Sequence, residues 1–173
     1  MSEPKTTARP GAARCTIELY KEAFKFSAAH FTLFSARERE RLHGHDFFVS
    51  CALTGPLGEG GLIADYGPVK RRLRALCGEL DEVLLLPGAS PWLQVEPGGD
   101  EVRATFAGRT MSFLATEVRI LPIANITLEA LSVYLLERLL DDGALQALGA
   151  EQVTLKVSAG PGQSSAACWR ATP

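Results

Sequence analysis

Alternating apolar and polar residues predict two strands in the first third of the chain, over residues 15–30 and 43–54. The apolar positions are Ile17, Leu19, Phe24 and Phe26 in the first segment and Phe47, Val49 and Cys51 in the second. Successive side chains of a strand point to opposite faces of its sheet, so each predicted strand has a largely apolar face. Residues 35–41 between them are densely charged, which favours an exposed connection. Residues 1–14 are polar and contain Pro4 and Pro10, so we predict a flexible tail there.

Two later segments carry apolar residues at helical spacing, from residue 68 to 80 and from residue 128 to near Gly143. Their apolar positions are Val69, Leu73, Leu76 and Leu80 in the first and Leu128, Leu131, Leu135 and Leu139 in the second. Between these helices, short alternating runs broken by glycine and proline predict accessory hairpins over about residues 90–120. Apolar and polar residues alternate over residues 153–157, which predicts a third main strand, and residues 165–169 can form a fourth.

This order of elements predicts an α+β fold. We expect a four-stranded antiparallel sheet with two helices on one face, plus the inserted hairpins. With 173 residues the chain is long enough for one domain with a substantial core, which we place at residues 15–173.

Composition narrows the classes of function. The chain is 46% hydrophobic and 22% charged, as in ordinary soluble globular proteins. A formal net charge of −2 argues against nucleic acid or an anionic membrane as an obligate partner. The four cysteines are scattered, which is typical of reduced cytosolic proteins, and no apolar run reaches membrane-spanning length. The amino terminus also lacks the apolar segment of a signal peptide, so we expect a cytoplasmic protein.

The three histidines of the chain lie in two short segments, 26–30 and 42–46. His43 and His45 are two residues apart, so a strand would point both imidazoles to one face, with Gly44 between them. His30 on a neighbouring strand would complete a three-nitrogen set and leave one position of a tetrahedral zinc ion open, as in catalytic zinc sites. An isolated His-Gly-His can equally be a turn or a buried pair. That alternative is weaker here because no histidine lies elsewhere in the chain.

Five short motifs occur in an order and spacing that resemble one enzyme family. They are Phe-Ser-Ala-Ala-His at 26–30, His-Gly-His at 43–45, Asp-Tyr-Gly-Pro-Val-Lys at 65–70, Leu-Asp at 80–81 and Thr-Leu-Glu at 127–129. From about residue 20 to 169 the chain is similar to the 6-pyruvoyltetrahydropterin synthase and 6-carboxytetrahydropterin synthase family. The resemblance implies the tunnelling fold, in which subunits join their sheets into a barrel, as a homo-trimer or homo-hexamer with active sites between subunits. It also implies a small-molecule substrate and a Zn²⁺ ion bound by His30, His43 and His45.

The chain departs from the family pattern at several positions. Arg39 stands where pterin-forming members have a cysteine, and Glu82 stands where they have the histidine of a Leu-Asp-His motif. Ala159 or Ser158 occupies the place of a glutamate that holds the pterin ring, and Ala130 that of a frequent asparagine. Arginine cannot act as a base, and loss of a buried charged partner typically costs about 1–3 kcal/mol or more. We therefore expect little 6-pyruvoyl- or 6-carboxytetrahydropterin synthase activity.

Glu40 gives the chain a different match within the same family. Residues 40–45 resemble the Glu-x-x-His-Gly-His variant, in which a glutamate replaces the cysteine. Enzymes of that variant cleave the side chain of dihydroneopterin triphosphate to give 6-hydroxymethyl-dihydropterin. Glu40 also belongs to an alternating Arg/Glu run, in which a glutamate at this position could arise without a catalytic role.

Three interpretations of function follow. The first is a zinc-dependent lyase or cyclase in which Glu40, Glu82 or both transfer the proton, Asp81 orients the neighbouring group, and Thr127 and Glu129 bind the substrate. The second is a non-catalytic zinc-binding family member. The third, a purely structural metal site, is disfavoured because such sites are closed by a fourth protein ligand and no cysteine lies near the histidines in sequence.

Overall fold

The computed structural model describes residues 13–58, 60–141 and 149–171. The main-sheet strands are β1 (Arg14–His30), β2 (His43–Pro56), β3 (Val83–Pro87), β7 (Val118–Leu121), β8 (Gln152–Ser158) and β9 (Ser164–Arg170). The helices are α1 (Gly67–Leu80) and α2 (Leu128–Leu140), with one short 3-10 turn, η1 (Ala115–Glu117). A separate small sheet holds β4 (Leu93–Gly98), β5 (Glu101–Phe106) and β6 (Arg109–Leu114). Most of the predicted tail, residues 1–12, and the predicted helix end at Gly143 lie outside the described residues.

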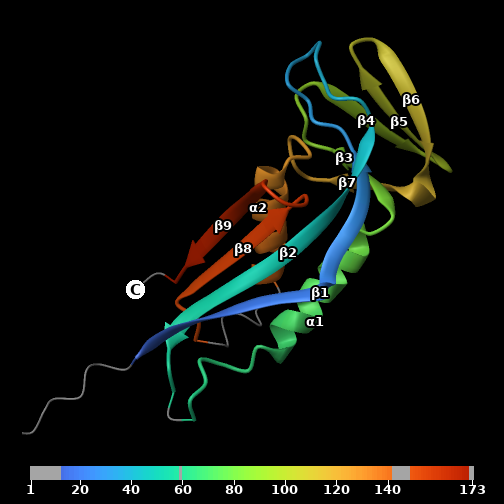
Figure 1. The fold of residues 1–173 in the computed structure, drawn as a ribbon. Coiled ribbons are helices and arrows are strands. Elements are labelled where there is room, and N and C mark those ends of the chain that lie inside the picture. Colours follow the sequence, from blue (N-terminus) through green and yellow to red (C-terminus); the bar gives the residue numbers. More distant parts are fainter. Residues whose placement is uncertain (1–12, 59, 142–148, 172–173) are drawn as a thin grey trace, which may run out of the picture.

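The main sheet has six strands in the order β7-β3-β1-β2-β8-β9 (Figure 1). The pairs β1–β2, β2–β8 and β8–β9 are antiparallel, whereas β1–β3 and β3–β7 are parallel. The predicted α+β class with two helices is confirmed, but the prediction of a four-stranded antiparallel sheet is wrong. Strand β3 was missed because its sequence, Val-Leu-Leu-Leu-Pro, is a continuous apolar run without alternation. Such runs are typical of parallel strands buried on both faces, and periodicity cannot distinguish them from a helix end.

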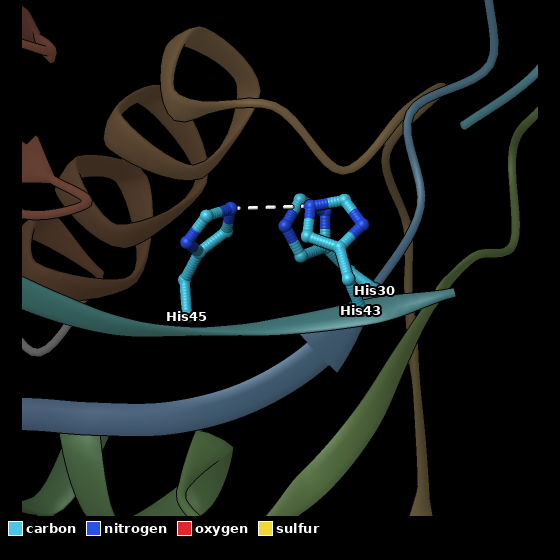
Figure 2. A group of neighbouring side chains, drawn as sticks. All are labelled: His30, His43 and His45. Carbon is cyan, nitrogen blue, oxygen red and sulfur yellow. Dashed lines mark hydrogen bonds between the residues drawn. The ribbon is translucent and has the colours of Figure 1, made fainter. Parts of the chain in front are cut away.

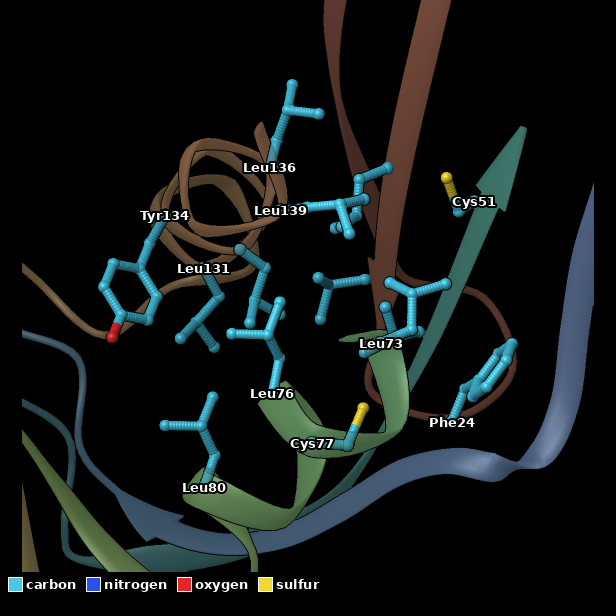
Figure 3. Packing of buried hydrophobic residues seen from close by; sticks show 14 of the residues in the cluster. Phe24, Cys51, Leu73, Leu76, Cys77, Leu80, Leu131, Tyr134, Leu136 and Leu139 are labelled. Carbon is cyan, nitrogen blue, oxygen red and sulfur yellow. The ribbon is translucent and has the colours of Figure 1, made fainter. Parts of the chain in front are cut away.

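Both helices contribute to one apolar core against the main sheet (Figures 1 and 3). Leu73 and Leu76 of α1 and Leu131 and Leu139 of α2 are each at most 2% exposed. Their spacing is that of one helical face, and burial of that face supplies most of a helix's stability in a protein. The sheet side of the core includes the alternating residues of β1, β2 and β8. This packing holds the end of β1 and the start of β2 close to the start of α2.

Strands β4, β5 and β6 form a three-stranded antiparallel sheet within the segment 90–120. A second apolar cluster links this small sheet to β3 and to the loop after β1. Its members include Phe31, Leu33, Leu84, Leu86, Val102 and Phe106. A two-residue turn joins β5 to β6, with positive φ angles of 49° at Ala107 and 76° at Gly108. Such turns match the twist of paired strands and set their register, here with Phe106 opposite Arg109.

The second face of the main sheet retains exposed aromatic side chains. Tyr20 on β1 is 72% exposed and Phe48 on β2 is 44% exposed. Strands β7 and β9 form the two edges of the main sheet. Among the described residues, no helix has the length and apolar character needed to cross a membrane.

Candidate metal centre

Three imidazoles meet where β1 ends and β2 begins (Figure 2). His30 is the last residue of β1 and pairs in register with His43, the first residue of β2. His45 lies two residues further along β2, opposite Ala28. Because side chains alternate along a strand, all three imidazoles belong to the sheet face that carries Phe26 and the rest of the core.

The geometry of the cluster is compact. The ring centroids of His30 lie 4.7 Å from His43 and 5.4 Å from His45, and those of His43 and His45 are 4.8 Å apart. One nitrogen from each ring lies within 4.8 Å of the other two, and the Nε2 atoms of His43 and His45 are 3.1 Å apart. Three nitrogens this close together, from rings held by two paired strands, can bind one metal ion.

The hydrogen bonds of the rings favour metal binding. The Nδ1 atom of His30 donates to the carbonyl oxygen of Ile126 at 3.2 Å, and Nδ1 of His43 donates to that of Arg41 at 2.7 Å. A carbonyl only accepts, so Nε2 of each neutral ring keeps its lone pair. Nε2 of His30 is buried and has no hydrogen-bond partner in the described part of the chain. Metal-bound histidines typically show this pattern, with the second nitrogen fixed by a backbone carbonyl. The three residues therefore fit a bound metal.

Electrostatics keep His30 neutral. The side chain is buried, and this burial, together with the neighbouring His43 and His45, lowers its pKa to about 4. An imidazole must be neutral to donate a lone pair to a metal. His43 is half-buried and His45 is exposed, so the cluster is open on one side.

Glu40 is the acidic residue that the structure places next to the cluster. Its Oε2 atom lies 3.9 Å from Nε2 of His43 and accepts a hydrogen bond of 3.0 Å from the backbone N–H of Thr32. Burial works against ionisation of Glu40, but hydrogen bonding from Thr32 and the nearby His43 outweigh it and hold its pKa below the ordinary value. The carboxylate is therefore ionised at neutral pH and can accept a proton.

Asp81 and Glu82 lie in the turn between α1 and β3. Asp81 accepts a 2.7 Å hydrogen bond from the backbone N–H of Ser27, and the N–H of Glu82 donates to the carbonyl of Ser27 at 2.8 Å. Glu82 lines a surface pocket of about 650 Å³ together with Ser27, Gly44 and Asp46. Ser27, Gly44 and Asp46 alternate with the three histidines along β1 and β2, so these three residues belong to the opposite face of the sheet. His45 also lines this pocket, but Glu82 forms no hydrogen bond or ion pair with any of the three imidazoles.

The two predicted substrate-binding residues lie at the start of α2. The Thr127 hydroxyl caps this helix by accepting a hydrogen bond from the N–H of Ala130 at 3.2 Å. Glu129 is exposed in the first helical turn. Because the carbonyl of Ile126 binds His30, this end of α2 adjoins the cluster.

Asn125 is a residue that sequence reasoning missed. Its side-chain oxygen accepts from the N–H groups of Leu33 and Ile126, both at 3.0 Å, and its amide donates to the carbonyl of Leu33 at 2.8 Å. These bonds tie the loop after β1 to the segment that leads into α2, and so position the carbonyl that binds His30. The sequence carries no signal for this role, since the partners are 92 residues apart.

Comparison with known proteins agrees with this architecture. The sequence model of the family described as 6-pyruvoyl tetrahydropterin synthase matches residues 18–165. A protein of Methanocaldococcus jannaschii, provisionally named 6-carboxy-5,6,7,8-tetrahydropterin synthase, is 28% identical over 148 residues, which cover 84% of this chain and 89% of that protein.

Solved structures extend the comparison to the fold. The 6-pyruvoyl tetrahydropterin synthase of Plasmodium vivax superimposes with a TM-score of 0.85 at 26% identity, covering 92% of this chain and 99% of that chain. The same synthase has been solved with a catalytic glutamate replaced by alanine or by cysteine, each at 25% identity, the same coverage and a TM-score of 0.85. The family match over most of the chain and the shared fold lead to one conclusion: this chain belongs to the 6-pyruvoyl tetrahydropterin synthase family.

Proposed function

We propose that the protein is a zinc-dependent lyase that cleaves the side chain of dihydroneopterin triphosphate to give 6-hydroxymethyl-dihydropterin. The observation that carries this proposal is the position of Glu40, whose carboxylate lies 3.9 Å from His43 in the three-imidazole cluster. Arg39, at the place of the family cysteine, cannot take a proton, whereas Glu40 beside it can.

The Plasmodium vivax synthase supports a catalytic role for Glu40. A glutamate is a catalytic residue in that protein, and Glu40 here occupies the Glu-x-x-His-Gly-His motif next to the imidazoles. We propose that Glu40 acts in the same capacity. The lowered pKa of Glu40 favours the ionised carboxylate that a base requires.

In this proposal each residue of the site has a separate role in the reaction. His30, His43 and His45 would hold a zinc ion, which supplies polarisation of a substrate oxygen. Glu40, oriented by the N–H of Thr32, would take the proton from the hydroxyl of the second side-chain carbon. The bond between the first and second side-chain carbons then breaks, its electron pair stays on the ring-bound carbon, and that carbon receives a proton. The second carbon leaves as an aldehyde that carries the triphosphate.

Glu82 and Asp81 are weaker candidates for proton transfer within one chain. Both residues bind the backbone of Ser27, and neither contacts an imidazole of its own chain through a hydrogen bond or ion pair. The family resemblance implies active sites between subunits, which would allow a second subunit to contribute. We therefore propose Glu40 as the proton-transfer residue of the same subunit.

The test is product analysis after incubation with dihydroneopterin triphosphate. We expect 6-hydroxymethyl-dihydropterin to appear, with little 6-pyruvoyl- or 6-carboxytetrahydropterin. A protein that binds zinc but releases none of these products would be a non-catalytic family member. Formation of 6-pyruvoyltetrahydropterin at the rate of a family member with cysteine and histidine intact would overturn the proposal.

We expect the protein to form a homo-trimer or homo-hexamer. Strands β7 and β9 leave edges in the single chain, and the exposed Tyr20 and Phe48 add apolar surface to the second face of the sheet. Sedimentation should show a mass well above the 18.6 kDa of one chain. Phe48→Asp should weaken the assembly, whereas Val133→Asp on the exposed side of α2 should not. A stable monomer at micromolar concentration would contradict this expectation.

A further inference from the structure

A pocket lined by arginines lies between the loop after β1 and the β5–β6 hairpin. Its volume is about 580 Å³, and its lining includes Arg37, Arg39, Arg109, Phe106, Thr110 and Met111. None of the lining residues is acidic. The pocket is distinct from the imidazole cluster and from the surface pocket at Glu82, with which it shares no residue.

Among the described residues, Arg39 is held in place without a carboxylate partner. Its guanidinium carbon lies 4.6 Å from the ring centroid of Phe31 and 5.8 Å from that of Phe106. Its Nη1 donates to the carbonyl oxygen of Glu40 at 2.7 Å, and its Nη2 lies 3.5 Å from the sulfur of Met111. Aromatic faces and a carbonyl orient a guanidinium but leave its charge uncompensated. Arg39 is therefore a fixed cation at the wall of the pocket.

Arg37 and Arg109 add two further charges from different segments. Both are exposed, and neither forms an ion pair with any residue in the part of the chain that the structure describes. The loop that carries Arg37 is closed by hydrogen bonds from the N–H groups of Phe34 and Ser35 to the carbonyl of Glu38, at 2.9 and 3.1 Å. Arg109 directly follows the tight turn at residues 107–108. The loop after β1 and the β5–β6 hairpin thus bring together at one pocket three guanidiniums that have no carboxylate partner among the described residues.

We propose that this pocket binds the di- or triphosphate group of a small molecule. Guanidiniums match phosphate oxygens with paired, charge-assisted hydrogen bonds. One carboxylate would neutralise only one of the three charges, whereas a polyphosphate carries several charges along a short chain that can reach all three arginines. The Thr110 hydroxyl offers an additional donor.

The pocket adjoins the candidate metal centre through one residue. Arg39 binds the backbone carbonyl of Glu40, and the carboxylate of Glu40 lies beside His43. If the proposed function is right, the pocket would hold the phosphate end of the substrate. The proposal that the pocket binds polyphosphate follows from its arginines alone, and it does not require that the protein be an active lyase.

Calorimetric titration of the purified full chain with tripolyphosphate tests the proposal directly. We expect saturable binding that weakens as salt is raised, since ion pairs near a surface are screened. Arg37→Gln and Arg109→Gln should each weaken binding about tenfold, which corresponds to loss of one charge-assisted contact. Arg39→Lys, which keeps the charge but loses the planar fork, should also weaken it.

Two controls make the result decisive. Arg103→Gln removes the same charge from β5 of the same small sheet, outside the pocket, and should leave the affinity unchanged. The His43→Ala, His45→Ala variant removes the candidate metal ligands and should still bind tripolyphosphate. The proposal would be overturned if tripolyphosphate did not bind, or if citrate bound more tightly than tripolyphosphate. It would also be overturned if the arginine variants bound as well as Arg103→Gln, or if only the histidine variant lost binding.

Discussion

Replacement of both His43 and His45 by alanine is expected to abolish binding of zinc, of which the unchanged protein should hold close to one ion per chain. The variant leaves His30 as the single imidazole at the site, and one neutral nitrogen cannot hold zinc against water. The unchanged protein presents three nitrogens within 4.8 Å of one another, and backbone carbonyls fix the rings of His30 and His43. Elemental analysis of purified protein measures the effect.

The same variant should change the response of stability to metal. A ligand that binds only the folded state raises the melting temperature, so added zinc should stabilise the unchanged protein and chelators should reverse this. Neither should shift the melting temperature of the double variant. Asp46→Asn is the matched control, because it alters a neighbouring position of β2 on the opposite face. Full zinc content in the double variant would contradict our assignment of the metal ligands.

Replacement of Glu40 by glutamine is expected to lower turnover of dihydroneopterin triphosphate by about 10²–10⁴-fold, the usual contribution of a general base. The amide keeps the shape of the side chain, and its oxygen can still accept the hydrogen bond from Thr32. The fold and the zinc content should therefore remain unchanged while the proton acceptor is lost. Rates of product formation at saturating substrate provide the measurement.

The control for this prediction is Glu38→Gln in the same loop. Glu38 contributes its backbone carbonyl to the loop, and its exposed side chain has no hydrogen bond or ion pair in the described part of the chain. The Glu38→Gln variant should therefore retain full activity. If Glu40→Gln is as active as Glu38→Gln, Glu40 is not the base. If Glu40→Gln instead loses its zinc together with activity, the residue supports the metal centre and does not transfer the proton.

The sequence by itself determined the elements whose signal is local. Apolar residues alternate along β1, β2 and β8 and recur at helical spacing in α1 and α2, because each of these elements buries one face. The pattern can therefore be seen within each segment alone. The same alternation put His43 and His45 on one face of β2, as the structure places them. The metal-binding hypothesis therefore needed only the period of a strand and a third imidazole nearby.

Only the tertiary structure decided how distant segments meet. Parallel pairing of β3 with β1 and β7 leaves no periodic pattern, because a strand buried on both faces is apolar throughout. Glu40 and Glu82 were equivalent candidates in the sequence, yet the fold places the Glu40 carboxylate 3.9 Å from His43, whereas Glu82 lies in the turn before β3 and binds the backbone of Ser27. The arginine pocket likewise depends on a loop and a hairpin that are far apart in sequence. Contacts of this kind are set by packing between segments, and no single segment encodes them.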